Sequence, residues 1–173
     1  MRLVIAGIVQ DDAYFEEQVE PYINRSVVEY VGSVGPDQRQ EMLGGALALL
    51  HMIHYDEPFG LSVFESMACG TPVIAFGRGS MPEIIRDGST GFIVDDVDAA
   101  VQAVGKTDSL DRRVCRDEVE KRFTCQRKAH EYVRVYQQIM ADRENYRPWW
   151  HYEDLLERDD HKLKELIFNP GER

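Results

Sequence analysis

Short apolar runs alternate with mixed polar segments along the chain as far as residue 105. The apolar runs show no polar alternation, which is typical of parallel strands buried on both faces. They predict strands at residues 3–6, 27–31, 46–53, 72–76 and 92–94. The segments between them are bounded by Asp, Pro and Gly, and they predict helices at residues 13–22, 36–43, 61–69, 81–85 and 97–104. This alternation predicts an α/β fold, with an open parallel sheet and helices on both faces.

The pattern becomes entirely helical after Gly105. Two helices are expected at residues 108–123 and 124–141, and a charged stretch containing Leu155, Leu163 and Ile167 follows them. Its apolar positions fit one face of an amphipathic helix. We therefore expect one domain at residues 1–141 and a helical tail at residues 142–173, which docks against the body of the protein or lies between domains.

Composition narrows the range of partners. The chain has 173 residues and a formal net charge of −11, so it lacks the basic surface that tracks nucleic-acid phosphates. No apolar run is long enough to span a bilayer, and the first residues do not form a signal-peptide pattern. The odd number of cysteines, three, favours reduced thiols. We expect a cytoplasmic protein that binds no nucleic acid, with peripheral membrane attachment left open for a full-length enzyme.

Metal binding is not indicated. His51 and His54 flank the end of the third predicted strand, but with Asp56 alone they do not complete a ligand set. We therefore expect neither a metal nor a cofactor.

The most informative segment runs from Asp56 through the sequence Glu-Pro-Phe-Gly-Leu-Ser-Val-Phe-Glu. Two carboxylates, Glu57 and Glu65, bracket a glycine-containing loop that opens a helix after a strand. Free N–H groups at a helix start can hold a diphosphate, Ser62 adds a hydroxyl donor, and carboxylates accept hydrogen bonds from sugar hydroxyls. Taken singly, each carboxylate fits a solvated loop or a favourable charge near the helix dipole. Their conjunction with the sequence Met-Ala-Cys-Gly-Thr-Pro-Val that follows favours a binding site.

This segment resembles the donor-site signature of retaining family-4 (group 1) glycosyltransferases with the GT-B architecture, and weaker similarity extends over residues 3–140. The resemblance implies a Rossmann-like fold, the C-terminal half of a GT-B enzyme. It implies that Glu57 contacts the donor sugar and is the catalytic-site residue, and that Glu65 binds the ribose hydroxyls. The remaining substrate-binding positions that it implies are Phe59, Gly60, Leu61 and Ser62 beside the sugar and phosphate, and Ser33 and Val34 beside the nucleobase.

The family resemblance also implies what this chain lacks. Group 1 enzymes place an Arg and a Lys before the first strand of this domain, and they carry the acceptor site on an N-terminal domain. We therefore expect a missing N-terminal acceptor domain as partner, and little or no turnover by this chain alone. The implied reaction transfers a sugar from a UDP-, GDP- or ADP-linked donor to an acceptor hydroxyl, with retention of configuration. The sequence identifies neither the base, the sugar nor the acceptor.

Other functions remain open at this point. A non-catalytic nucleotide-binding module, descended from a transferase domain, would have the same fold. A receiver-like signalling domain is favoured only by Asp11 and Asp12 after the first strand, because no Lys follows the fifth strand. The related GT-B epimerases share the architecture without the signature from Glu57 to Glu65.

Overall fold

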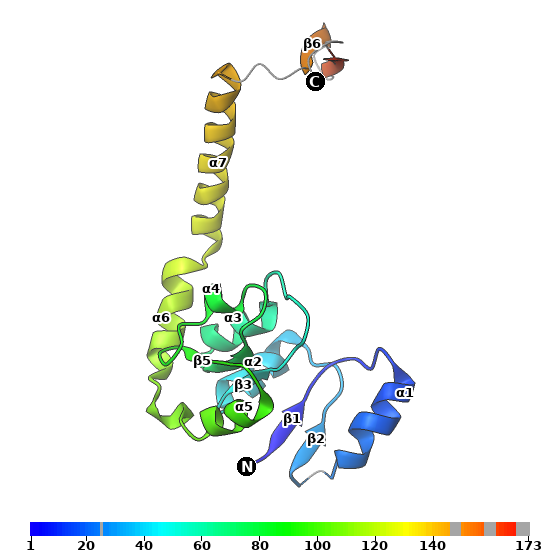
Figure 1. Cartoon of the computed structure of the whole chain (residues 1–173), viewed down its shortest axis with the longest axis vertical. Helices are drawn as coiled ribbons and strands as arrows, with labels where there is room; N and C mark the ends of the chain where they lie inside the picture. Colours follow the sequence, from blue (N-terminus) through cyan, green and yellow to red (C-terminus); the bar gives the residue numbers. More distant parts are fainter. Residues whose placement is uncertain (25, 146–149, 158–161, 169–173) are drawn as a thin grey trace. The chain divides into compact units, whose positions relative to one another are not determined.

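The computed structural model describes residues 1–24, 26–145, 150–157 and 162–168 (Figure 1). The chain separates into two compact units, Met1–Arg122 and Phe123–Arg173. We call them unit 1 and unit 2 and describe each by itself. The expected domain boundary at residue 141 stays a prediction.

Unit 1 contains the predicted alternation of strands and helices. Its strands are β1 (Leu3–Ile5), β2 (Val28–Tyr30), β3 (Leu49–His51), β4 (Val73–Phe76) and β5 (Gly91–Val94). Its first helical segment is α1 (Asp12–Tyr14), which continues as the π turn η1 (Phe15–Val19) and the 3-10 turn η2 (Glu20–Tyr22). The later helices are α2 (Pro36–Gly45), α3 (Leu61–Ala68), α4 (Met81–Ile84), α5 (Val97–Val104), the 3-10 turn η3 (Thr107–Ser109) and α6 (Arg112–Arg122).

The strands pair in parallel, but in two ladders. β1 pairs with β2, while β3, β4 and β5 form a second sheet in that order. An apolar cavity of about 460 Å³ is lined by residues of both β1 and β3, including Val4 and Leu50. The single continuous sheet expected from the sequence is thus divided between these two strands in the described part of unit 1.

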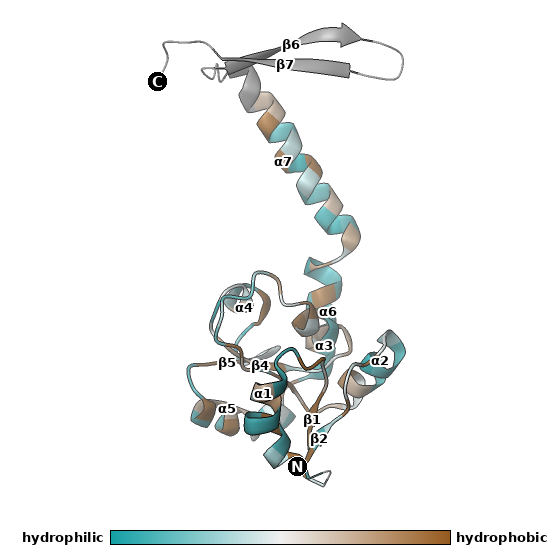
Figure 2. Ribbon diagram, turned by 90° about the vertical axis from the view of Figure 1, so that its right-hand side faces the viewer, coloured by the Kyte–Doolittle hydropathy of each residue, from teal (hydrophilic) through white to brown (hydrophobic). Residues whose placement is uncertain are grey.

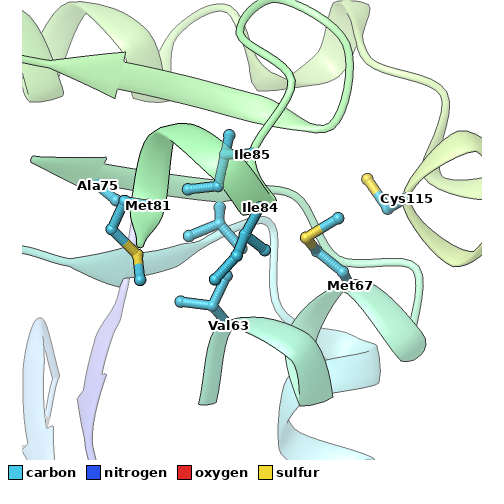
Figure 3. Close-up of a cluster of buried hydrophobic side chains, with 8 residues drawn as sticks. Val63, Met67, Ala75, Met81, Ile84, Ile85 and Cys115 are labelled. Atoms are coloured by element: carbon cyan, nitrogen blue, oxygen red, sulfur yellow. The ribbon is translucent and has the colours of Figure 1, made fainter. Parts of the chain in front are cut away.

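β4 is the centre of the core, because side chains of a strand alternate between its two faces. Val73 and Ala75 belong to a cluster on one face, and Ile74 and Phe76 to a cluster on the other. The first cluster also contains Val63, Met67, Met81, Ile84, Ile85 and Cys115, from α3, α4, α6 and the residue that follows α4 (Figure 3). The second contains Val94, Ala100 and Ala103 from β5 and α5. Helices therefore cover both faces of a parallel sheet, and the predicted Rossmann-like α/β class is confirmed.

Arg112 at the start of α6 fixes the end of α2. Its guanidinium donates to the carbonyl oxygens of Gly44 and Ala46, each at 2.7 Å, and to the hydroxyl of Thr71 at 2.5 Å. A cation at a helix C-terminus satisfies carbonyls that have no partner within the helix. These bonds hold α2 against the segment that follows α3.

Unit 2 begins with the long helix α7 (Cys125–Asn145), which carries hydrophilic and hydrophobic residues along its length (Figure 2). Helix was expected throughout the tail, and beyond Asn145 this expectation is wrong for the described residues. β6 (Trp150–Glu157) and β7 (Lys162–Phe168) form an antiparallel pair. Short apolar runs do not distinguish helix from strand, and pairing between two segments leaves no local periodicity. The rest of the expected tail, and Trp149 with it, lies outside the described residues.

Among the helices that the structure describes, none is both long enough and apolar enough to cross a bilayer.

Candidate functional site

The predicted site residues lie on segments that follow the carboxyl ends of β2 and β3. Ligands of open α/β sheets bind at this edge. Glu57, Phe59 and Gly60 lie on the loop between β3 and α3, whereas Leu61, Ser62 and Glu65 lie on α3 itself. Ser33 and Val34 lie on the loop between β2 and α2, with Ser33 exposed and Val34 half-buried.

The Glu57 carboxylate accepts hydrogen bonds on both of its oxygens. The backbone N–H of Gly60 donates to Oε1 at 3.0 Å, and the hydroxyl of Tyr55 donates to Oε2 at 2.9 Å. The Gly60 hydrogen bond, followed by the Tyr55 hydrogen bond, holds the pKa of Glu57 below its usual range. At neutral pH the site therefore presents an ionised and oriented carboxylate, which can accept further hydrogen bonds from hydroxyl groups.

The main chain of Glu57 is clamped by the loop between β4 and α4. Its carbonyl oxygen accepts from the backbone N–H of Ser80 at 2.9 Å and from the Ser80 hydroxyl at 3.0 Å. Gly79 has a φ of +53°, and a Cβ at this position would lie only 2.6 Å from the Glu57 nitrogen. Glycine is therefore required at residue 79 for the two loops to approach this closely.

Gly60 brings the chain from this loop into α3. Its φ of +74° is left-handed, and a Cβ there would meet the terminal methyl of Met81 at 2.7 Å. The helix starts without a side-chain cap, and Leu61 follows as an exposed residue in its first turn. The ring of Phe59 lies 4.7 Å from the ring of Phe64 between centroids, which braces the loop on α3.

Glu65 lies one turn further along α3 and faces α2. Its Oε1 is 2.9 Å from the guanidinium of Arg39, in a pair that is partly exposed on both sides. Both residues line a cavity of about 520 Å³ between α2 and α3, to which Gln40 and Arg116 also contribute. A carboxylate beside a cavity of this size can accept hydrogen bonds from the hydroxyls of a ligand.

His51 ends β3 and is a half-buried neighbour of the loop. Burial lowers the pKa of His51, and the negative charge of Glu57 opposes this only in part. His51 is therefore a neutral imidazole at pH 7. In the part of the chain that the structure describes, no group of three metal-ligating side chains converges, here or elsewhere.

Three contributors to this region were not identified from the sequence. Tyr55 forms a hydrogen bond with Glu57, and Arg39 forms an ion pair with Glu65. Neither contact could be predicted from the spacing of these residues in the sequence. Ser80 follows Gly79, and glycine at that position is a signal that could have indicated a close approach of backbones. The place of Ser33 and Val34 in a site stays a prediction.

The fold and the signature loop define a Rossmann-like domain of the GT-B type. The family profile described as "Glycosyl transferases group 1" matches residues 1–131. The chain belongs to this family.

Individual relatives match only part of their own length. A D-inositol 3-phosphate glycosyltransferase of Streptomyces scabiei is 42% identical over 77 residues, which are 44% of this chain and 17% of the relative. The N-acetyl-alpha-D-glucosaminyl L-malate synthase of Bacillus anthracis is 31% identical over 105 residues, 56% of this chain and 28% of the relative. The chain thus spans well under half of these relatives.

Solved structures share the fold. AviGT4, a glycosyltransferase involved in avilamycin A biosynthesis, superposes with a TM-score of 0.68 at 30% identity, over 81% of this chain and 44% of that one. The Anabaena protein HepE has a TM-score of 0.59 at 18% identity, a likeness in fold alone, over 84% of this chain and 41% of that one. Both support the GT-B architecture.

Proposed function

We propose that unit 1 is the donor-binding domain of a glycosyltransferase that uses a nucleoside-diphosphate sugar. The observation that carries this proposal is the oriented Glu57 carboxylate at the entry to α3, in a chain of the group 1 family. A carboxylate that is ionised, half-buried and hydrogen-bonded on both oxygens suits recognition of sugar hydroxyls better than proton transfer.

The roles proposed for the neighbouring residues follow the order of the chemical groups along the donor, from sugar to nucleobase. Glu57 accepts from the hydroxyls of the sugar, and the backbone around Phe59, Gly60 and Leu61 approaches the sugar and the diphosphate. Ser62 contributes a hydroxyl donor near the helix start, where the α3 dipole favours negative charge. Glu65, beside the cavity between α2 and α3, accepts from the ribose hydroxyls. Ser33 and Val34 border the nucleobase.

The proposed reaction transfers the sugar to an acceptor hydroxyl with retention of configuration. The diphosphate departs while positive charge develops on the sugar, and the acceptor attacks from the same face. Stabilisation of the departing phosphate by positioned donors supplies most of the rate enhancement. We propose that a second domain provides the acceptor site and further cations. This chain alone then binds nucleotide weakly and transfers little or no sugar. The names of the relatives support sugar transfer as the chemical class.

Titration of the chain with UDP, GDP and ADP, followed by amide NMR, tests the proposal. We expect saturable shifts in α3 for at least one nucleotide, and about tenfold weaker binding by Glu65→Ala, because a hydrogen bond to a charged group contributes about 1.5–3 kcal/mol. Glu41→Ala is the control, since Glu41 is an exposed glutamate on the neighbouring helix α2. Absence of binding to all three nucleotides, or equal loss in both variants, would contradict the proposal.

A further inference from the structure

Tyr55 lies on the loop between β3 and α3, and the group 1 resemblance assigns it no role. It lies two residues before Glu57, on the loop that leaves β3, and it is 61% exposed. Despite this exposure its hydroxyl donates to Oε2 of Glu57 at 2.9 Å. An exposed tyrosine whose hydroxyl donates to a carboxylate rather than to water restricts the rotamers of that acidic side chain.

The Gly60 and Tyr55 donors to Glu57 differ in kind. The Gly60 donor is a backbone amide, so the hydrogen bond does not depend on a side chain. The Tyr55 donor is a side-chain group, which the sequence can add or remove without altering the loop. Because Ser80 already fixes the Glu57 main chain, the remaining freedom of Glu57 lies in its side-chain torsions. The Tyr55 hydroxyl therefore restrains side-chain torsions that the backbone clamp leaves free, together with the N–H of Gly60.

We propose that Tyr55 is a positioning residue for recognition of the donor sugar, which acts by holding the Glu57 carboxylate toward the sugar hydroxyls. The proposal rests on the function proposed above. It makes Tyr55 important for the sugar portion of the donor and not for its nucleotide portion.

The protonation states of the pair are compatible with this role. Hydrogen bonding to Glu57 raises the pKa of Tyr55, so its hydroxyl keeps its proton throughout the neutral range. The same bond helps to keep Glu57 ionised, so donor and acceptor do not exchange roles. Loss of the hydroxyl leaves Glu57 charged at pH 7, because the ordinary pKa of Glu is near 4.3. The expected effect at neutral pH is therefore one of orientation.

Binding of paired ligands to the full chain tests the proposal. The probes are UDP, GDP and ADP, each compared with its glucose conjugate. The quantity measured is the ratio of the two dissociation constants, which isolates the contribution of the sugar. For Tyr55→Phe we expect a three- to tenfold loss of sugar-nucleotide affinity with the affinity for the free nucleotide unchanged within about twofold, as for one charge-assisted hydrogen bond. Glu57→Gln should lose at least as much.

Tyr22→Phe is the matched control, because Tyr22 is 68% exposed and ends η2 outside the signature loop. A second measurement is the pKa of the Glu57 carboxyl, followed by ¹³C NMR. It reports specific loss of the Tyr55 hydrogen bond, as distinct from a general loss of structure. This pKa should rise in Tyr55→Phe and stay unchanged in Tyr22→Phe.

The outcomes separate the two proposals. If the wild-type chain binds none of the probes, the proposed function fails and this inference fails with it. If the wild type binds them and Tyr55→Phe keeps the wild-type ratio, only the inference is overturned. Equal weakening of nucleotide and sugar nucleotide would also overturn it, because Tyr55 would then support the loop as a whole.

Discussion

At the level of single residues, two titratable groups around one loop are both deprotonated at neutral pH, for different physical reasons. Glu57 accepts hydrogen bonds, which lower its pKa and keep it charged. His51 is half-buried, and burial lowers its pKa and keeps it neutral. Both shifts favour the folded state at pH 7, but they are lost in different pH ranges. The histidine loses its contribution first as the pH falls.

This difference predicts the acid response of the fold. Since the folded-state pKa of His51 lies below 6.5, its contribution is complete above pH 6.5 and disappears as the pH falls through the lowered value. We expect the free energy of unfolding to decrease between pH 7 and pH 5, and this decrease to be smaller in His51→Gln. Urea denaturation at several pH values measures it. His54→Gln is the control, because His54 is exposed. An identical pH profile for His51→Gln and wild type would be evidence against this role.

At the level of elements, the contact between the β3–α3 and β4–α4 loops determines the position of Glu57. Gly79→Ala should therefore displace Glu57, because an added Cβ would overlap its main chain. We expect a loss of about 1–3 kcal/mol of stability, as for a strained residue at positive φ, together with loss of sugar-nucleotide binding. Denaturation and the amide shift of Gly60 measure the two effects.

Gly88→Ala is the control for Gly79→Ala, because it separates the cost of a positive φ from the cost of a steric overlap. Gly88 has a φ of +70°, yet a Cβ added to it would meet nothing within 4 Å. This variant should show the cost of positive φ alone, and binding should persist. If both variants behaved alike, the close approach at Gly79 would not be what positions the loop.

Local signals explain which elements could be predicted from the sequence. α3 ends where expected, because Gly70 adopts a φ of +76° and Pro72 prevents continuation of the helix. β3 is shorter than the apolar run that predicted it, since its ends depend on pairing with β4 and on the hydrogen bond from Arg112 to Ala46. Such contacts between distant segments leave no periodicity in the sequence.

The candidate site shows the same division. Glu57 and Glu65 could be identified because a motif of fixed spacing contains them. Their partners Tyr55 and Arg39 could not, because each contact depends on side-chain rotamers and on how the loop folds. Family resemblance thus names the residues proposed to face the ligand, and it gives no indication of the residues that hold them.

At the level of the whole molecule, the core of unit 1 is complete without unit 2. All members of its two buried clusters lie between Val63 and Cys115. A unit with its own core unfolds independently unless an extensive interface couples it to its neighbour. The distribution of tryptophan makes this testable, because Trp149 and Trp150 are the two tryptophans of the chain and both belong to unit 2.

We expect tryptophan fluorescence and the amide NMR signals of β4 to report different urea transitions in the intact chain, since one probe follows unit 2 and the other follows unit 1. A chain truncated after Phe123 should keep the β4 transition, with a change of no more than about 1 kcal/mol in the free energy of unfolding. The matched measurement is Met67→Ala in the intact chain. Met67 is fully buried in the core of unit 1, so this variant should lower the β4 transition by about 2–5 kcal/mol and leave the tryptophan transition in place. Coincident transitions for both probes in wild type and in Met67→Ala would show instead that the two units unfold as one.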